Sequence, residues 1–178
     1  SPYAFYGYES LKSIIIGNSV MSIESSVFED CNSLTSVTIG SGVKSIDNYA
    51  FADCNNLTKV NYTGAIDEWV QIEFSSYMGN PIYYAKNLFI NDVLVTEANI
   101  TTATKISNFA FNNCDSLTSV TIGDGVESIG KQAFENCSNL TSVTIGDGVG
   151  SIGEQAFRIC VNLAKVTIGD SVTEIGRN

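Results

Sequence analysis

The feature that most constrains the fold of this chain is an internal repeat. Residues 117–137 read LTSVTIGDGVESIGKQAFENC, and residues 140–160 read LTSVTIGDGVGSIGEQAFRIC. Counted with two trailing residues each, the two units agree at 18 of 23 positions. A fixed period of this length is typical of solenoids, in which a short unit buries its apolar side only by stacking on its neighbours. The sequence therefore predicts an array of stacked coils.

The unit recurs along nearly the whole chain. Aligned on a repeated Phe and on the Leu that follows it, neighbouring units are 23 residues apart, except across one gap of 60 residues between Leu57 and Leu117. Inside that gap, Val95, Ala98 and Ile100 reproduce the Leu-x-x-Val-x-Ile spacing. The chain therefore carries seven predicted strand segments, and the unit that follows Leu57 is enlarged.

Each unit has a predicted internal order. The alternation in Leu-Thr-Ser-Val-Thr-Ile predicts a short strand with Val120 and Ile122 pointing inward. Gly-Asp-Gly at residues 123–125 predicts a turn, because glycine tolerates unusual backbone angles and aspartate bonds its own backbone. A second short extended piece follows. Residues 131–136 then predict a brief helical turn that buries Phe134.

We predict that residues 1–178 form one domain, a right-handed solenoid of about seven coils with a parallel sheet along one face. Both ends of the sequence fall inside a unit, and neither carries an obvious polar cap. We therefore expect the chain to be a piece of a longer array.

An insertion at roughly residues 64–94 is the one part that the repeat does not explain. Its apolar and aromatic positions with helical spacing are Ile66, Trp69, Val70, Phe74 and Tyr77. This spacing predicts a helix with Thr63 as its N-cap, ending at residues 79–81, which read Gly-Asn-Pro. Residues 88–95 then predict a tight hairpin that turns at Asn-Asp.

Composition and charge exclude several classes of function. The net charge of −10 disfavours binding to nucleic acid and to anionic membranes. No run approaches the roughly 18 consecutive apolar residues of a membrane span, so we expect no membrane insertion within this chain. Histidine is absent, which removes His-based triads, His general bases and His metal ligands. We predict no catalytic residue, no metal site and no cofactor.

The recurring unit L-x-x-V-x-I-G-x-x-V-x-x-I-G-x-x-A-F-x-x-C resembles the BspA-like (Treponema pallidum type) leucine-rich repeats. The insertion, with IDEWVQIEF and NPIYYAKNLFIN, is similar to an interruption in bacterial members. The resemblance implies a leucine-rich-repeat solenoid, secreted or displayed on the surface of a host-associated bacterium. It also implies adhesion or binding to host proteins as the role. Gly-Asp-Gly stands where many members have Pro, which puts only the turn in doubt.

The outward positions of the predicted strands form the candidate surface for a protein partner. These positions are Ser36, Thr38, Lys59, Asn61, Glu97, Asn99, Ser119, Thr121, Ser142, Thr144, Lys165 and Thr167. A strand surface rich in β-branched residues needs no function, so a passive stalk that binds nothing stays open as an alternative. Hydroxyl ladders also occur in ice-binding arrays, but Lys59, Glu97 and Lys165 interrupt the regularity.

The aromatic insertion admits two interpretations. Its candidate site residues are Trp69, Tyr77, Tyr83 and Tyr84. Packed on the solenoid, they would form a satellite core. Exposed in water, they would form a platform for a glycan or a hot spot for a protein, and the chain would then be a carbohydrate-binding module.

Two columns of similar residues invite metal or redox chemistry. Five cysteines occupy one position of the unit: Cys31, Cys54, Cys114, Cys137 and Cys160. We interpret them as buried free thiols, because parallel side chains in a column do not converge as a disulfide requires. Asp124, Asp147 and Asp170 form a column of turn residues, for which calcium binding is the alternative.

Overall fold

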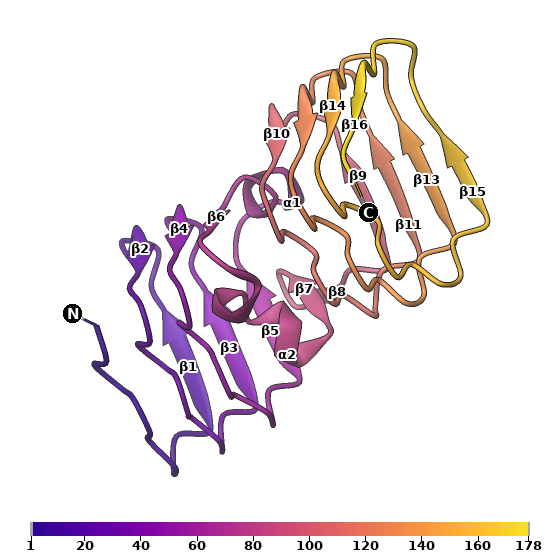
Figure 1. Ribbon diagram of the computed structural model, residues 1–178. Helices are drawn as coiled ribbons and strands as arrows, with labels where there is room; N and C mark the ends of the chain where they lie inside the picture. Colours follow the sequence, from indigo (N-terminus) through magenta and orange to yellow (C-terminus); the bar gives the residue numbers. More distant parts are fainter. Residues whose placement is uncertain (1, 178) are drawn as a thin grey trace.

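The computed structural model describes residues 2–177 as a stack of coils in two displaced parts (Figure 1). The long strand of each coil joins one of two large sheets. The first large sheet has the order β1 (Ser13–Ile16), β3 (Ser36–Ile39), β5 (Lys59–Tyr62), β7 (Leu88–Ile90) and β8 (Val93–Leu94). The second large sheet has the order β15 (Lys165–Thr167), β13 (Ser142–Ile145), β11 (Ser119–Ile122) and β9 (Glu97–Ile100). The predicted leucine-rich-repeat solenoid is confirmed.

The second extended piece of each coil also forms two sheets. One has the order β2 (Ser22–Ile23), β4 (Ser45–Ile46) and β6 (Glu73–Phe74). The other has the order β10 (Lys105–Ile106), β12 (Ser128–Ile129), β14 (Ser151–Ile152) and β16 (Glu174–Ile175). All strand pairs are parallel except β7 with β8.

The 23-residue period sets the register because equivalent residues of successive coils pair directly. Val120 lies opposite Val143, and Ile122 lies opposite Ile145. All four side chains are at most 2% exposed, so each strand presents its apolar positions to one continuous core. The phenylalanines also stack, with ring centroids 5.2 Å apart for Phe111 and Phe134. A residue that packs well in one coil therefore packs well in the next.

The cysteine column is part of the same inter-coil packing. The thiol of Cys54 donates to the carbonyl oxygen of Phe28 at 3.1 Å, and Cys137 donates to Phe111 in the same way at 3.2 Å. All five cysteines are free thiols, as predicted. Burial raises the pKa of Cys54 to about 12. These groups act as small apolar side chains with a weak donor.

The predicted helical turn over residues 131–136 is wrong. The backbone N–H groups of Gln132 and Asn136 donate to carbonyl oxygens of the next coil, at Glu154 and Arg158. In a helix over these residues, the N–H of Asn136 would instead donate to the carbonyl oxygen of Gln132. Gln132 and Asn136 also adopt φ angles of 53° and 57°, outside the right-handed helical region. Successive tight turns replace the helix and still bury Phe134 completely.

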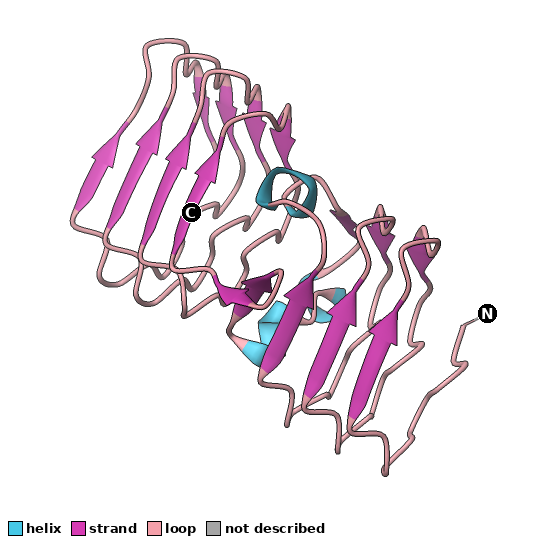
Figure 2. Ribbon diagram, turned by 180° about the vertical axis from the view of Figure 1, so that it is seen from behind, coloured by secondary structure: helices cyan, strands magenta, loops and turns pink. Residues whose placement is uncertain are grey.

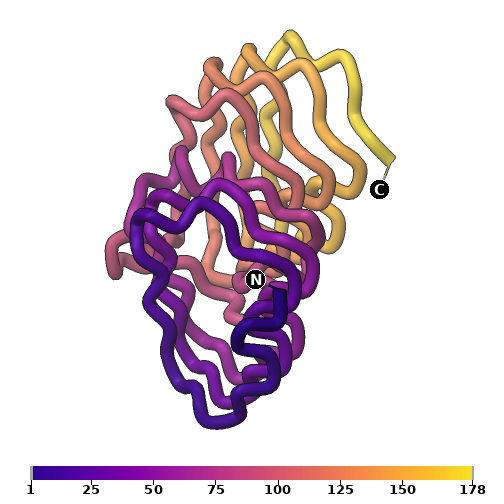
Figure 3. The backbone as a smooth tube through the Cα atoms, turned by 90° about the vertical axis from the view of Figure 1, so that its left-hand side faces the viewer, coloured from indigo at the N-terminus to yellow at the C-terminus, as the bar shows by residue number. Residues whose placement is uncertain are grey.

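The predicted parallel sheet is present as two separate sheets, divided at the insertion. Strand β9 pairs with β11 and not with β7 or β8, so the outward positions before and after the insertion belong to separate sheets. Figure 2 shows the long strands of both large sheets running the same way, with the second sheet displaced sideways from the first. Figure 3 shows the same displacement from the side, as two stacks of coils that do not lie on one line.

The predicted long helix is also wrong, whereas the hairpin is confirmed. The helices of the insertion are α1 (Ile66–Trp69), the 3₁₀ turn η1 (Tyr77–Gly79) and α2 (Ile82–Ala85). The N-cap of α1 is Ala65, not Thr63, and the Glu68 carboxylate accepts its N–H at 2.9 Å. Between α1 and η1, β6 pairs with β4, because Phe74 continues the buried column of Ile23 and Ile46. Asn91 and Asp92 make the hairpin turn with positive φ angles.

The insertion joins the two stacks through contacts from α1. The Trp69 indole N–H donates to the carbonyl oxygen of Ala110 at 2.9 Å, and its ring lies 5.5 Å from the ring of Tyr62. One carboxylate oxygen of Asp67 accepts the backbone N–H groups of Thr101, Thr102 and Ala103 at 2.7 to 2.8 Å. Burial alone would raise the pKa of Asp67, but these three donors hold it below its usual value. We call α1 with these contacts the joint.

Candidate functional site

The outer face of the second large sheet brings eight of the predicted partner-binding residues together. Strand register places them in two rows, one of Glu97, Ser119, Ser142 and Lys165, the other of Asn99, Thr121, Thr144 and Thr167. The second row is exposed along its whole length, whereas the two serines of the first row are half-buried. Beneath both rows, Val120 and Val143 are at most 2% exposed. The face is thus a set of short polar groups on a closely packed support.

The outer face of the first large sheet differs from this pattern. Ser36 and Thr38 are half-buried, and Lys59 bonds the Asp92 carboxylate at 2.7 Å. Asn61 is only 5% exposed, because its side-chain oxygen accepts the N–H of Asp92. The prediction of Asn61 as a partner-facing residue is therefore wrong, since the hairpin covers it.

The hairpin adds an aromatic ring that sequence reasoning missed on this face. Phe89 pairs with Asn61 in register and so takes an outward position, with the Lys59 ammonium 5.1 Å from its ring centroid. Leu94 lies opposite Phe89 and is 41% exposed. The alternation around Phe89 could have indicated its direction, but nothing in the sequence shows that β7 pairs with β5.

The aromatic residues of the insertion do not form one platform. Trp69 is fully buried in the joint, which agrees with the interpretation of a satellite core and rules out its stacking on a sugar. Tyr84 is half-buried, and burial raises its pKa to about 12. Tyr77 and Tyr83 are half-buried as well, with ring centroids 4.9 Å apart. Tyr77 and Tyr83 both line a cavity together with side chains of the coils.

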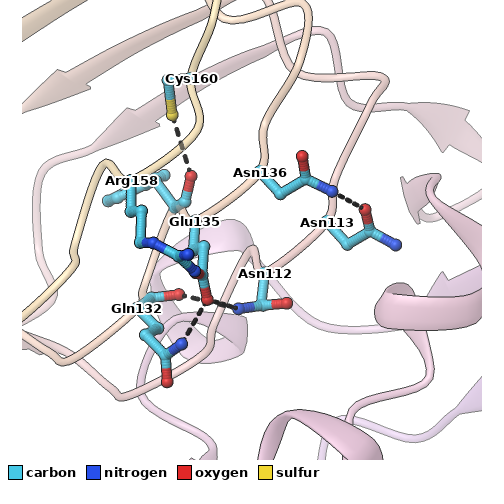
Figure 4. Close-up of polar contacts among 8 residues, drawn as sticks. Asn112, Asn113, Gln132, Glu135, Asn136, Arg158 and Cys160 are labelled. Carbon is cyan, nitrogen blue, oxygen red and sulfur yellow. Dashed lines mark hydrogen bonds and ion pairs between the residues drawn. The ribbon is translucent and has the colours of Figure 1, made fainter. Parts of the chain in front are cut away.

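This polar cavity has a volume of about 320 Å³. It is lined by Tyr77, Tyr83, Asn112, Gln132, Glu135, Asn136, Arg158 and Ile159. Its centre is Glu135, which is 8% exposed and is bonded to Arg158 at 2.6 Å (Figure 4). Asn112 and Gln132 donate to the other carboxylate oxygen. A buried carboxylate requires this degree of pairing, because an unpaired charge would be too costly to bury.

Sequence reasoning missed the coil residues of the polar cavity, although a signal was present. The two near-identical units differ at only 5 of 23 positions, and two of those differences are Glu135 against Arg158 and Asn136 against Ile159. Both pairs line the cavity. Departures from an otherwise regular repeat therefore mark the place where successive coils differ in chemistry.

The aspartate column has the turn role that was predicted for it. The side-chain oxygen of Asp124 accepts the backbone N–H of Asp147 at 2.9 Å, and Asp147 accepts that of Asp170 at 3.0 Å. Asn18 does the same for Ser41 in the first stack, at 3.2 Å. Across residues 2–177, no three Cys, Asp or Glu side chains converge as a set of metal ligands.

Comparison with known families supports the repeat assignment. The family model described as "BspA type Leucine rich repeat region" matches six copies over residues 1–79 and 82–178. The chain belongs to this BspA-type leucine-rich repeat family. A search of curated proteins found no match.

Solved structures with TM-scores above 0.5 share the fold. A protein from Bacteroides ovatus is 22% identical over 99% of this chain, with a TM-score of 0.67. The pneumococcal vaccine antigen PcpA is 15% identical over 93% of this chain, with a TM-score of 0.54. A Treponema pallidum leucine-rich repeat protein is 24% identical over 98% of this chain, with a TM-score of 0.48. The chain spans 42%, 56% and 64% of these three structures, less than two thirds of each.

The helices of this BspA-type chain are short. Within residues 2–177, none of them has the length and apolar character to cross a bilayer.

Proposed function

We propose that this chain is a non-enzymatic recognition module, which binds an extracellular or host protein through the outer face of its second large sheet. The observation that carries the proposal is the exposed row of Asn99, Thr121, Thr144 and Thr167, which stands on the buried Ala98, Val120 and Val143 except at the terminal strand β15, where Val166 is exposed. A location outside the bacterial cell, either secreted or at the surface, is part of the same proposal. The resemblance to host-associated BspA-like proteins supports it.

The physical character of this face suits a protein partner. Threonine and serine lose little side-chain entropy on binding, and each hydroxyl can both donate and accept a hydrogen bond. A regular spacing of such groups spreads recognition over many weak contacts and needs no special residue. The net charge of −10 favours partners with a basic surface, chiefly by steering their approach.

The test compares two pairs of substitutions in binding to a panel of purified extracellular-matrix and plasma proteins, measured by surface plasmon resonance. Thr121→Arg with Thr144→Arg should weaken binding to a panel member at least about tenfold, since two large charged groups prevent close contact. The matched control is Ser128→Arg with Ser151→Arg, on neighbouring strands of a short sheet. The control should leave affinity unchanged, and both pairs should leave the melting temperature nearly unchanged.

The passive-stalk alternative makes a different prediction. A stalk would bind no member of the panel, and neither pair of substitutions would change anything. Binding that survives Thr121→Arg with Thr144→Arg would instead place the contact on another face and would refute the proposal as stated.

A further inference from the structure

The polar cavity is built where the insertion meets the turn side of the second stack, away from the face assigned to a protein partner. Tyr77 and Tyr83 reach it from η1 and α2, and Gln132, Glu135 and Arg158 reach it from two successive coils. Its volume of about 320 Å³ lies at the lower end of the range for small-molecule sites, roughly 300 to 1,000 Å³.

The shape of the cavity is fixed by hydrogen bonds between the insertion and the coils. The side-chain amide of Asn113 donates to the carbonyl oxygen of Tyr83 at 2.5 Å, and Asn136 donates to Asn113 at 2.5 Å. Asn80 similarly donates to the carbonyl oxygen of Phe109 at 2.7 Å. A ligand would therefore meet walls that are already ordered, which lowers the entropic cost of binding.

The charge in the cavity is balanced. Glu135 is the carboxylate at its centre, and Arg158 forms an ion pair with it at 2.6 Å. No second carboxylate and no lysine lines the cavity in the described part of the chain. The site therefore carries no net charge, although the chain as a whole carries −10. This balance favours a neutral ligand over an anion or a cation.

Several polar groups at the cavity have capacity that the protein does not use. Among the described residues, no hydrogen bond reaches the side-chain oxygen of Asn112, and none reaches the phenol oxygens of Tyr77 and Tyr83. Arg158 uses one of its guanidinium N–H groups on Glu135 and keeps others free. Two tilted rings beside amide, carboxylate and guanidinium groups match a molecule with an apolar face and an edge of hydroxyls.

We propose that this cavity binds one neutral saccharide unit, with the Tyr77 and Tyr83 rings against its C–H face and the Asn112, Gln132 and Arg158 side chains on its hydroxyls. The site binds and does not hydrolyse, because glycoside hydrolysis ordinarily uses two carboxyl groups and Glu135 is alone in the cavity. Glu135 positions Arg158 and Gln132 through the hydrogen bonds already described.

The test is saturation-transfer NMR with a panel of free sugars. The panel contains glucose, galactose, mannose, N-acetylglucosamine and their β-linked disaccharides, with glucuronic acid as the charged control. We expect a neutral member to bind with a dissociation constant of roughly 0.1 to 1 mM, which corresponds to about 4 to 5.5 kcal/mol. The same neutral sugars immobilised as polysaccharide then distinguish recognition of a free sugar from recognition of a chain end.

Two variants assign the binding to the cavity. Tyr83→Ala and Gln132→Ala should each weaken binding of the sugar at least about fivefold, with circular dichroism reporting that the fold is retained. The matched control is Tyr49→Ala, since Tyr49 is an exposed tyrosine at the position equivalent to Gln132 in an earlier coil. It should bind the sugar as the unmodified chain does.

Three results would overturn the proposal. The first is the absence of a signal from any neutral sugar at 50 mM, about fifty times the weaker expected dissociation constant. The second is binding of glucuronic acid and of no neutral sugar. The third is sugar binding that both cavity variants retain. Thr121→Arg with Thr144→Arg should leave sugar binding intact, so this proposal and the proposed protein-binding function fail independently.

Discussion

The regular coils and the insertion hold their neighbours by different kinds of contact. In the coils, the same interactions recur every 23 residues, such as the stacked Phe111 and Phe134 rings and the Cys137 thiol on a carbonyl oxygen. In the insertion, contacts such as those of Asp67 and Trp69 are made by single residues without a repeat equivalent. Contacts within the coils therefore have equivalents in neighbouring coils, whereas each contact between the insertion and the second stack, including those of Asn113 with Tyr83 and Asn80 with Phe109, is made once.

The largest expected effect comes from removing the indole at the joint. Trp69→Ala and Phe134→Ala should each lower the free energy of unfolding by about 3 to 5 kcal/mol, because each removes a fully buried ring. Only Trp69→Ala should split or broaden urea unfolding and lower the apparent m value, since the two stacks would lose their coupling. One sharp transition with an unchanged m value for Trp69→Ala would contradict this account of the joint.

Alkaline pH should separate the thiols of the coils from the phenols of the insertion. Burial raises the pKa of Cys114 from its usual 9.0 to about 11, and that of Tyr84 from 10.0 to about 12. Below pH 9 both the folded and the unfolded thiol are protonated, so the full stability is present. Above pH 9 the unfolded thiol ionises first, and one such group lowers the free energy of unfolding by about 2 kcal/mol at pH 11.

The measurement is the free energy of urea unfolding at pH 8 to 11.5. For each variant, its change with pH is compared, and not its absolute value. Cys114→Ala should reduce the loss that begins near pH 9, whereas Tyr84→Phe should reduce only the loss that begins near pH 10. Identical pH dependence in Cys114→Ala and the unmodified chain would show that this thiol is solvated in the folded state.

A smaller effect distinguishes two aspartates that bond backbone N–H groups. Asp67→Ala leaves three donors of the joint without a charged acceptor and should cost about 1.5 to 3 kcal/mol in denaturant unfolding. Asp124→Ala removes one such bond within the coils and should cost only about 0.5 to 1.5 kcal/mol. Because the pKa of Asp67 is lowered, its contribution is complete above its usual value of 3.8 and is lost as the pH falls through the folded pKa. Equal costs for the two variants at pH 7 would argue against a special role for the joint.

The last comparison is between two glycines of one turn, and it includes the smallest expected effect, that of Gly150→Ala. A Cβ atom on Gly148 would lie 1.8 Å from the carbonyl oxygen of Asp124, so Gly148→Ala should force neighbouring coils apart and cost about 1 to 3 kcal/mol. On Gly150 the nearest atom would be 3.8 Å away, and the equivalent residue one coil earlier is Glu127. Gly150→Ala should be neutral or stabilise by up to about 1 kcal/mol. Differential scanning calorimetry measures both, and a stabilising Gly148→Ala would contradict the spacing of the coils.

The coils could be predicted from the sequence because each residue has an equivalent in the next coil. The 23-residue period predicts that Val120 points inward, that it pairs with Val143, and that the cysteines are free thiols. The turns at residues 131–136 could not be predicted, since their backbone donors bond another coil and local pattern alone favoured a helix. The prediction of one long helix in the insertion was wrong for the same reason, because the partners of Trp69 and Phe74 lie on different stacks.

The candidate sites show the same limit. Outward strand positions such as Thr121 and Thr144 were predictable from alternation. The burial of Asn61 under the hairpin and the proximity of Tyr83 to Arg158 depend on where the insertion packs. The repeat pattern does not predict that position.

The fluorescence of Trp69 tests most directly whether the insertion is a packed joint, because Trp69 is the only tryptophan of the chain. Full burial predicts a blue-shifted emission maximum and little quenching by acrylamide in the folded protein, with both changing on unfolding. A red-shifted emission that acrylamide quenches readily in the folded protein would place the indole in water. That result would contradict the joint and the ordered walls of the polar cavity together.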